Sequence, residues 1–245
     1  LADGSAHIAV HSLKDVPMDL PQGFALACIL EREDPRDAWV SPHFDSLESL
    51  PQGAVVGTSS LRRTVLLHAL RPDLKIEPLR GNLDTRLRKL DEGQYAGIVL
   101  ATAGLKRLGL AERIRHSFDL DRMMPAAGQG AIGIEICDDR PDLAALLAPL
   151  NDVPTAVRVY AERGVSRTMG GSCSMPLAAH ATLAHGILAI SAAWGDPNNS
   201  HAPLIQAKDQ CEIDVSHPTA LQQASDLGIR VANQLIQKGA VAVVK

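Results

Sequence analysis

The sequence predicts an α/β fold followed by a small C-terminal α+β domain. Up to about residue 150, short apolar runs bounded by Gly, Pro, Asp or Ser alternate with stretches of helical periodicity. This alternation is typical of strands with helices on both faces of their sheet. From residue 153 the pattern changes to one long helical stretch, two neighbouring strand-like runs and a final amphipathic helix. Strands grouped together in this way are typical of an α+β domain.

The first part of the chain contains five predicted buried strands and three predicted helices. The strands are His7–Val10, Phe24–Leu30, Ala54–Val56, Ile98–Ala101 and Ala131–Ile136. The helices are Ser60–Leu70, Leu83–Glu92 and Pro141–Leu150. Asn82 is a suitable N-cap for the second helix, and Gly93 is a suitable residue to end it.

The second part of the chain begins at a predicted domain boundary near residues 151–154. The elements expected after it are a helix over 155–169, strands over 177–183 and 187–193, a loop over 196–201 and a last helix over 219–238. We find no internal repeat and no low-complexity segment in either part.

The composition excludes several classes of protein. The chain has 245 residues, 46% of them hydrophobic, and a net charge of −4, so it is expected to fold and not to bind polyanions over its whole surface. Aromatic residues make up only 3%, too few for platforms that stack single-stranded nucleic acid. No apolar run reaches the roughly 18 residues of a membrane span, and the four cysteines form no metal-ligand pattern. We therefore expect a soluble cytoplasmic protein with no metal, nucleic-acid or membrane partner.

The segment Gly57–Arg63 (GTSSLRR) is the strongest candidate for an anion site. It follows a predicted strand and opens a helix, so the hydroxyls of Thr58 and Ser60 lie where free backbone N–H groups meet the positive end of the helix dipole. Arg62 and Arg63 stand in the first turn, where the dipole disfavours cations. A bound carboxylate or phosphate would explain them. The alternative is a serine cap followed by two solvated arginines.

Basic residues continue beyond this turn. Positions 60–110 hold ten Lys and Arg against five Asp and Glu, a charge of +5 in a chain of −4 overall. Arg80 and Arg86 flank Gly81–Asn82, a second junction between strand and helix. Because arginine binds carboxylates in a bidentate manner, two such turns predict a cleft for a polyanion. The alternative is a solvated basic face.

The segment His11–Pro17 (HSLKDVP) follows the first predicted strand, and open α/β sheets bind ligands at the carboxyl ends of their strands. Asp15, next to Lys14, could there stabilise a cationic intermediate or accept N–H bonds. A structural role for Asp15 in a turn is the alternative. His11 beside Ser12 suggests nucleophilic catalysis, but no third member of a triad is evident.

Two glycine-rich segments are candidates for a specific role, one as a site of covalent modification and one as a backbone feature. Cys173 lies in the turn MGGSCSMP, where a thiol is accessible for covalent modification, whereas Cys28 and Cys137 lie inside apolar runs and are expected to be buried. The segment Ala126–Glu135 lacks the spacing of a dinucleotide-binding fingerprint. It predicts instead a hinge or a close approach of two backbones.

Taken in order, these segments resemble the porphobilinogen deaminase (hydroxymethylbilane synthase) family. The further matching segments are Glu31–Ala38 (EREDPRDA), Leu79–Asn82 (LRGN), Thr85–Leu87 (TRL) and Ala103–Gly109 (AGLKRLG). The resemblance runs from Leu1 to the C-terminus and is weakest after about Leu183. A match of this many motifs in the same order as in the family is not expected by chance.

The resemblance implies two lobes like those of type II periplasmic binding proteins and a small C-terminal α+β domain, with hinges near 31–35 and 125–130. The implied domains are residues 1–30 with 131–148, residues 36–124 and residues 153–245. The family's first strands would precede Leu1, so we expect the first domain to lack its N-terminal part and to expose a strand edge. Such a fragment is expected to be inactive or prone to aggregation.

The resemblance also implies a monomeric transferase of haem biosynthesis, which joins four porphobilinogen molecules into the linear tetrapyrrole hydroxymethylbilane and releases ammonia. A dipyrromethane cofactor, attached to Cys173 by a thioether, would prime the chain. Asp15 matches the catalytic aspartate. The matching cofactor-binding residues are Ser12, Lys14, Thr58, Ser60, Arg62 and Arg63, and the matching substrate-binding residues are Arg80, Arg86 and Arg107.

Two alternatives from other classes remain open. A non-catalytic small-anion-binding protein of the same fold would account for the hydroxyl-rich turns and the arginines, but not for Cys173 on an exposed turn. A thiol hydrolase that uses Cys173 would need a histidine partner, and no histidine has a spacing that identifies it as one.

Overall fold

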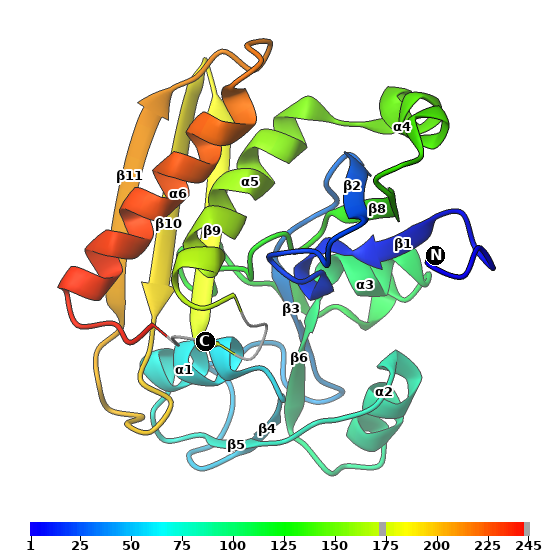
Figure 1. Cartoon of the computed structure of the whole chain (residues 1–245). Helices are drawn as coiled ribbons and strands as arrows, with labels where there is room; N and C mark the ends of the chain where they lie inside the picture. Colours follow the sequence, from blue (N-terminus) through cyan, green and yellow to red (C-terminus); the bar gives the residue numbers. More distant parts are fainter. Residues whose placement is uncertain (172–174, 243–245) are drawn as a thin grey trace.

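In residues 1–171 and 175–242, which the computed structural model describes, the strands form three separate sheets (Figure 1). The first sheet combines segments that are far apart in the sequence. Its central strand β8 (Ile132–Cys137) pairs antiparallel with both β1 (Ala9–Ser12) and β2 (Phe24–Ile29). Helix α4 (Pro141–Leu147) and the short helix η3 (Ala148–Leu150) pack against β2.

The second sheet has five strands in the order β5-β4-β6-β3-β7. The strands β4 (Val55–Gly57), β5 (Lys75–Glu77) and β6 (Gly97–Ala101) are parallel, whereas β3 (Asp37–Val40) and β7 (His116–Ser117) run antiparallel to their neighbours.

Helices cover both faces of this sheet. Helix α1 (Leu61–Leu70) packs on one face through Leu66 and Leu67, together with Trp39 and Val99. Helices α2 (Leu83–Asp91) and α3 (Thr102–Arg107) pack on the other face with Ile98 and Leu100, and the short helix η2 (Ala111–Arg113) follows α3. The predicted α/β class is confirmed.

The third sheet is an antiparallel meander of β9 (Leu177–Ala184), β10 (Ile187–Trp194) and β11 (Ile205–Glu212). Helices α5 (Val153–Thr168) and α6 (Ala220–Gln237) pack together against it and share its core. A Cβ on Gly228 would lie 2.0 Å from the Ala161 carbonyl oxygen, so glycine is what allows the two helices to touch. The predicted C-terminal α+β arrangement is confirmed.

Several elements differ from the sequence-based expectation. Strand β1 lies two residues later than predicted, so His11 and Ser12 belong to the strand and the helix η1 (Leu13–Asp15) follows at once. The predictions also missed β3, β5, β7, β11 and α3. Strands β5 and β7 have only three and two residues, and β11 (IQAKDQCE) carries mostly polar side chains, so none of them gives an apolar run.

A buried carboxylate connects all three sheets. Glu162 of α5 accepts two hydrogen bonds from the Arg32 guanidinium (2.7 and 3.1 Å) and one from the Gly128 N–H (2.8 Å). Arg32 and Gly128 lie on the two segments that connect the first and second sheets. It also accepts a hydrogen bond from the N–H of Ala181 in β9 (2.9 Å). Burial alone would raise the pKa of Glu162, but Arg32 and His180 outweigh it and lower that pKa to about 2. The charged form is therefore the stable one.

The same two connecting segments lie in close backbone contact. Gly130 has a φ of +89°, and a Cβ there would lie 2.4 Å from the Glu33 carbonyl oxygen. The close approach predicted for the glycine-rich segment is confirmed. Among the described residues, no helix is both long and apolar enough to cross a membrane.

Candidate functional site

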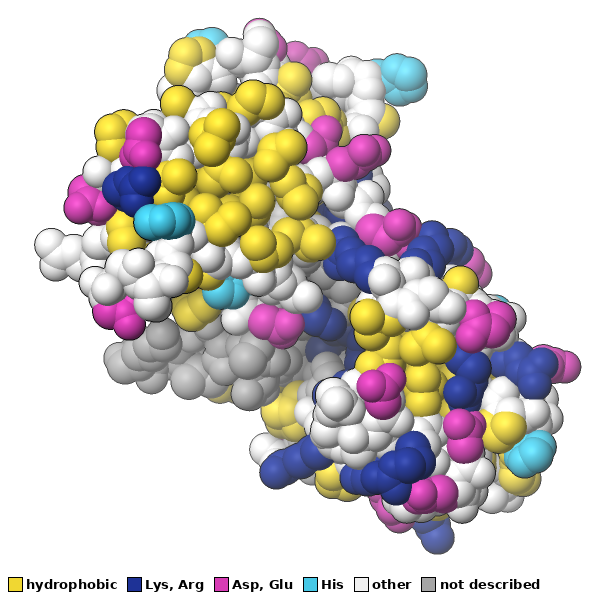
Figure 2. All heavy atoms as spheres, turned by 90° about the vertical axis from the view of Figure 1, so that its right-hand side faces the viewer, with side chains coloured by type: hydrophobic (Ala, Val, Ile, Leu, Met, Phe, Trp, Pro, Cys, Tyr) yellow, Lys and Arg dark blue, Asp and Glu magenta, His cyan; other side chains and the backbone are white. Residues whose placement is uncertain are grey.

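A cavity of about 540 Å³ opens where the three sheets meet. Its wall includes η1 at the end of β1, the start of α1, helix α2, residues 126–129, and both α5 and β9. Six residues predicted for the site line it, namely Lys14, Asp15, Ser60, Arg62, Arg63 and Arg86. Figure 2 shows Lys and Arg side chains gathered where the surface is hollowed between two parts of the molecule.

The turn from β4 into α1 is held by its own hydroxyl groups. The Ser60 N–H donates to Thr58 Oγ1 (3.2 Å), and the Arg63 N–H donates to Ser60 Oγ (3.4 Å). Thr58 is buried and does not line the cavity, whereas Ser60 caps α1 and does. Ser60 is therefore the N-cap, and the turn presents the start of α1 to the cavity.

Arg62 and Arg63 are buried and share one internal carboxylate. Arg62 Nη1 donates to Asp37 Oδ2 (2.7 Å), and Arg63 donates to Asp37 Oδ1 through Nε (3.1 Å) and Nη2 (2.7 Å). The Gln129 side-chain amide donates to the same Oδ1 (3.0 Å). Asp37 of β3 therefore already compensates part of the charge of these arginines, so an external anion is not their only counterion.

Asp37 has no exposed surface, and its environment keeps it ionised. Burial alone would raise the pKa of Asp37, but the two guanidinium groups outweigh it and hold that pKa well below its usual value. Sequence reasoning missed this residue. Asp37 lies in the family-matching segment Glu31–Ala38 and begins a short apolar run, but it stands 25 and 26 positions before its partners, and neither signal identified it as their counterion.

The cavity keeps an excess of positive charge. Lys14, Arg62, Arg63 and Arg86 contribute four cations, and Asp15 and Asp37 two carboxylates, which leaves +2 while Lys14 is protonated. Burial, with a smaller effect from nearby Arg63, lowers the pKa of Lys14 to about 8. Lys14 is therefore mostly charged at neutral pH, and the cavity suits a ligand with several carboxylates.

Asp37→Asn is expected to lower the free energy of unfolding by about 3–5 kcal/mol, because it leaves two buried guanidinium groups without a counterion. Asp142→Asn is the matched control. Its carboxylate pairs with Arg140 at the surface, where it is 61% exposed, and its loss is expected to leave the free energy of unfolding close to the parental value. Chemical denaturation of both variants measures the difference. Equal losses would contradict the role given to Asp37.

The structure does not bring the other predicted residues into the cavity lining. Ser12 ends β1 and is exposed, as is Arg80. The exposed Arg107 donates through Nη2 to the carbonyl of Gly130 (2.6 Å) on a connecting segment. Cys173 lies outside the described residues.

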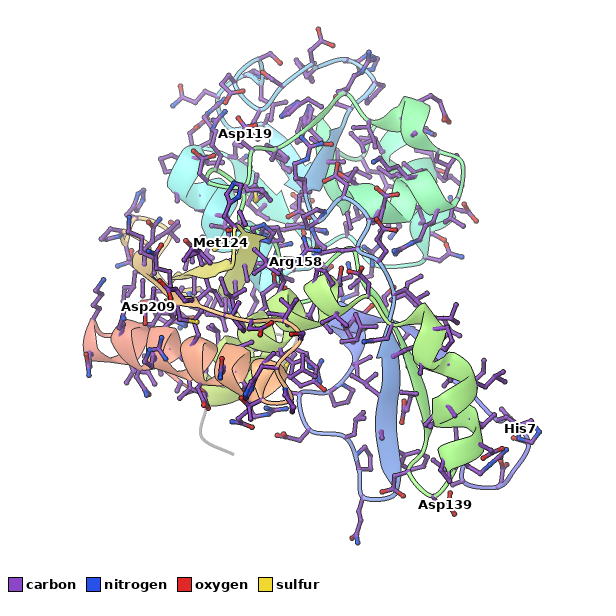
Figure 3. The ribbon with its side chains drawn as sticks, turned by 90° about the horizontal axis from the view of Figure 1, so that it is seen from above. His7, Asp119, Met124, Asp139, Arg158 and Asp209 are labelled. Atoms are coloured by element: carbon purple, nitrogen blue, oxygen red, sulfur yellow. The ribbon has the colours of Figure 1, made fainter. Side chains whose placement is uncertain are left out.

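Of the described residues on either side of that position, one lies at the cavity. Met175 lines it, and so does Met18, which follows η1 by three residues. A Cβ on Gly171 would lie 3.6 Å from the Met18 side chain. The Met124 carbonyl accepts a hydrogen bond from Arg62 (2.7 Å). Seen from above, Met124 lies at the junction of the second and third sheets, far from His7 and Asp139, which lie just outside the ends of β1 and β8 (Figure 3).

None of the three cysteines among the described residues lines the cavity. Cys28 is buried as predicted, and burial raises the pKa of its thiol. Cys137 is only partly buried, because it is the last residue of β8, so that prediction was wrong in degree. Cys211 of β11 is partly buried as well.

Comparison with known proteins identifies relatives over nearly the whole chain. Residues 1–145 match the family described as porphobilinogen deaminase, dipyrromethane cofactor binding domain, and residues 156–237 match the porphobilinogen deaminase C-terminal domain. A protein of Albidiferax ferrireducens named porphobilinogen deaminase is 64% identical over 96% of this chain and 73% of its own length. One of Paraburkholderia phymatum with the same name is 57% identical over all of this chain and 73% of its own length.

Similarity to solved structures is much weaker. A TRAP periplasmic solute-binding protein of Desulfovibrio salexigens aligns with 61% of this chain and 55% of its own. The TM-score is 0.36 and the sequence identity 14%. Such values assign neither a ligand nor an activity.

Proposed function

Because the chain belongs to the porphobilinogen deaminase family, we propose that its basic cavity binds the dipyrromethane cofactor and the growing pyrrole chain beside Asp15. The family's enzymes join four porphobilinogen molecules into hydroxymethylbilane with release of ammonia. The observation that carries the proposal is that Asp15 shares one cavity with four cations from η1, α1 and α2.

The cavity fits this cofactor in charge and in size. Dipyrromethane has two pyrrole rings, each with an acetate and a propionate, and a net charge of +2 with further N–H donors matches several carboxylates. A volume of about 540 Å³ is within the usual range for small-molecule sites. When bound, the cofactor supplies the pyrrole carbon to which the first substrate unit is joined. Lys14, Ser60, Arg62, Arg63 and Arg86 are the residues that would hold the carboxylates.

Asp15 has the charge that the reaction requires. Loss of ammonia from porphobilinogen leaves a cationic azafulvene, which is stabilised by a fixed carboxylate near its pyrrole N–H. Asp15 is the one carboxylate among the residues that line the described cavity wall. It would accept a hydrogen bond from the pyrrole N–H and offset the positive charge.

The other site assignments have different support. Thr58 accepts the Ser60 N–H, and we propose that it holds the turn and does not contact the ligand. Attachment of the cofactor to Cys173, and contacts of Ser12, Arg80 and Arg107 with cofactor or substrate, rest on the family resemblance alone.

We also propose that the three sheets are the cores of three domains, within residues 1–30 and 131–148, 36–124, and 153–245. The sheet order supports this division, since none of the strands in the described residues pairs across these limits. A monomer in the cytoplasm, with porphobilinogen as substrate and no nucleic-acid partner, is proposed from the resemblance.

Arg86→Gln tests the proposed site. Loss of one charged hydrogen-bond donor is expected to raise the KM for porphobilinogen about tenfold to a hundredfold, since such bonds contribute about 1.5–3 kcal/mol. Arg88→Gln is the matched control, because Arg88 lies two positions along the same helix, is exposed and pairs with Glu92. Steady-state kinetics of both variants measure the effect. Equal KM values in Arg86→Gln and the parent would show that Arg86 does not contribute to substrate binding.

The pKa of Lys14 predicts a pH dependence of substrate binding. Below about pH 8 its ammonium group is charged and attracts a carboxylate, and above that pH it becomes neutral. The KM for porphobilinogen is therefore expected to rise as the pH increases through about 8. Lys14→Arg, which stays charged, is expected to flatten this rise. The test is to measure the KM of the parent and of Lys14→Arg from pH 7 to 9. An equally steep rise of KM in both proteins would exclude Lys14 as its cause.

A further inference from the structure

Arg163 on α5 holds the segment that follows Asp15. In Figure 1, α5 lies between the C-terminal sheet and the chain that leaves β1. The guanidinium of Arg163 donates through Nη1 to the Val16 carbonyl (3.2 Å) and through Nη2 to the carbonyls of Pro17 (2.6 Å) and Met18 (3.1 Å). Three consecutive carbonyls therefore converge on one side chain.

These carbonyls begin at the residue directly after Asp15. On the other side, the Val16 N–H donates to the Leu13 carbonyl (3.2 Å) and closes η1. Leu13 is fully buried and belongs to a core with Val16 and with Ala156 of α5. Asp15 is thus fixed from both directions, by the turn of η1 before it and by Arg163 after it.

The chemistry of Arg163 is unusual for a residue that only adds stability. It is 6% exposed, and no described carboxylate lies within ion-pair distance of it. Burial, with a smaller effect from the neighbouring Arg167, lowers its pKa. A buried charge without a counterion is costly. Its planar set of five donors, however, fits converging carbonyls in a way that a single ammonium group does not.

The same helix leads toward the proposed cofactor attachment site. Helix α5 ends at Thr168, and Gly170 and Gly171 follow with φ values of +119° and +68°. Gly171 faces the side chain of Met18, one of the three residues whose carbonyls bind Arg163. The Asp15 segment is therefore packed against both the end of α5 and the turn that leads to residue 173.

We propose that Arg163 is a positioning residue that fixes Asp15 relative to the cofactor-bearing turn. This inference rests on the proposed function, because it takes Asp15 as the catalytic carboxylate and Cys173 as the attachment point. Arg163 attaches the segment that follows Asp15 to α5, the helix that precedes this turn, so the position of Asp15 depends on α5 as well as on the first sheet. A displacement of about 1 Å can cost about a hundredfold in rate.

The kinetic test uses Arg163→Gln and Arg163→Lys in the full chain, with Arg167→Gln as the matched control. Arg167 contacts the same segment through Met18 and Asp19, but it is 46% exposed. Activity is expressed per mole of cofactor-loaded protein, determined by intact mass. We expect kcat to fall about a hundredfold in Arg163→Gln with little change in KM, to remain low in Arg163→Lys, and to stay near the parental value in Arg167→Gln.

Three kinetic outcomes would overturn the inference. Parental kcat in Arg163→Gln with only a lower melting temperature would make the role purely structural. A higher KM at unchanged kcat would make Arg163 a binding residue. Full activity of Arg163→Lys would show that charge is sufficient and the geometry is not needed.

Hydrogen–deuterium exchange tests the contact itself without any turnover. Backbone amides of residues 13–20 are expected to exchange faster in Arg163→Gln than in Arg167→Gln, while the amides of α5 keep their parental rates. Unchanged exchange at 13–20 would overturn the inference even in an active enzyme. Faster exchange together with full activity of Asp15→Asn would instead show that Arg163 does hold residues 16–18 and that the proposed catalytic role of Asp15 is wrong.

Discussion

Cys173→Ser is expected to leave the chain without its covalent cofactor and without measurable turnover. A thiolate is a strong nucleophile at neutral pH, whereas a serine hydroxyl without an activating base is a weak one, so the thioether cannot form. Because the primer is the starting point for every pyrrole that is added, the loss is expected to be complete.

The measurement is the intact mass of the purified protein, combined with Ehrlich's aldehyde reagent for pyrroles. The parent is expected to exceed its sequence mass by two porphobilinogen-derived pyrrole units, and Cys173→Ser to have the sequence mass alone. Cys211→Ser is the control, since that thiol lies partly buried in β11 and does not line the cavity. Added mass that persists in Cys173→Ser, or disappears in Cys211→Ser, would contradict the attachment site.

Local patterns were sufficient to predict the parts of the site that are continuous in sequence. The turn Gly57–Arg63 was predicted to join a strand to a helix, and it does. The serine cap that it contains belonged to the alternative interpretation of this turn. The stretch that carries Asp15 was predicted to follow a strand, and it does, although β1 ends later than expected. Each of these features depends on hydrogen bonds between residues a few positions apart.

Long-range ion pairs were not predictable in the same way. Asp37 of β3 meets Arg62 and Arg63 of α1, and Arg32 meets Glu162 from 130 positions away. Nothing in local spacing selects those partners, because the sheet order brings them together. Arg163 is the same kind of case, since its acceptors are backbone carbonyls, which have no sequence signature.

Asp15→Asn is expected to lower kcat about a hundredfold to a thousandfold, the usual cost of removing one group that stabilises transition-state charge. Asparagine has nearly the same shape and keeps an oxygen that can accept a pyrrole N–H, so the change removes the negative charge and little else. KM is expected to change less than kcat, because Lys14, Arg62, Arg63 and Arg86 remain in the cavity.

Asp15→Glu and Asp19→Asn separate charge from position. Glutamate restores the charge but moves it by one methylene group, so an intermediate kcat is expected if both charge and place are needed. Asp19 is four positions away and 72% exposed, and it pairs with Arg167, so its replacement is expected to leave kcat unchanged. A parental rate in Asp15→Asn would show that the reaction does not use this carboxylate.

Ammonia release in a single turnover identifies the step at which Asp15 acts. If the carboxylate stabilises the cation left by the departing amine, Asp15→Asn slows ammonia release to the same extent as product formation, because the two share one barrier. If ammonia is released at the parental rate and only the product is delayed, Asp15 acts after the cation has formed. The cation that follows carbon–carbon bond formation is then the species that needs the negative charge in the cavity.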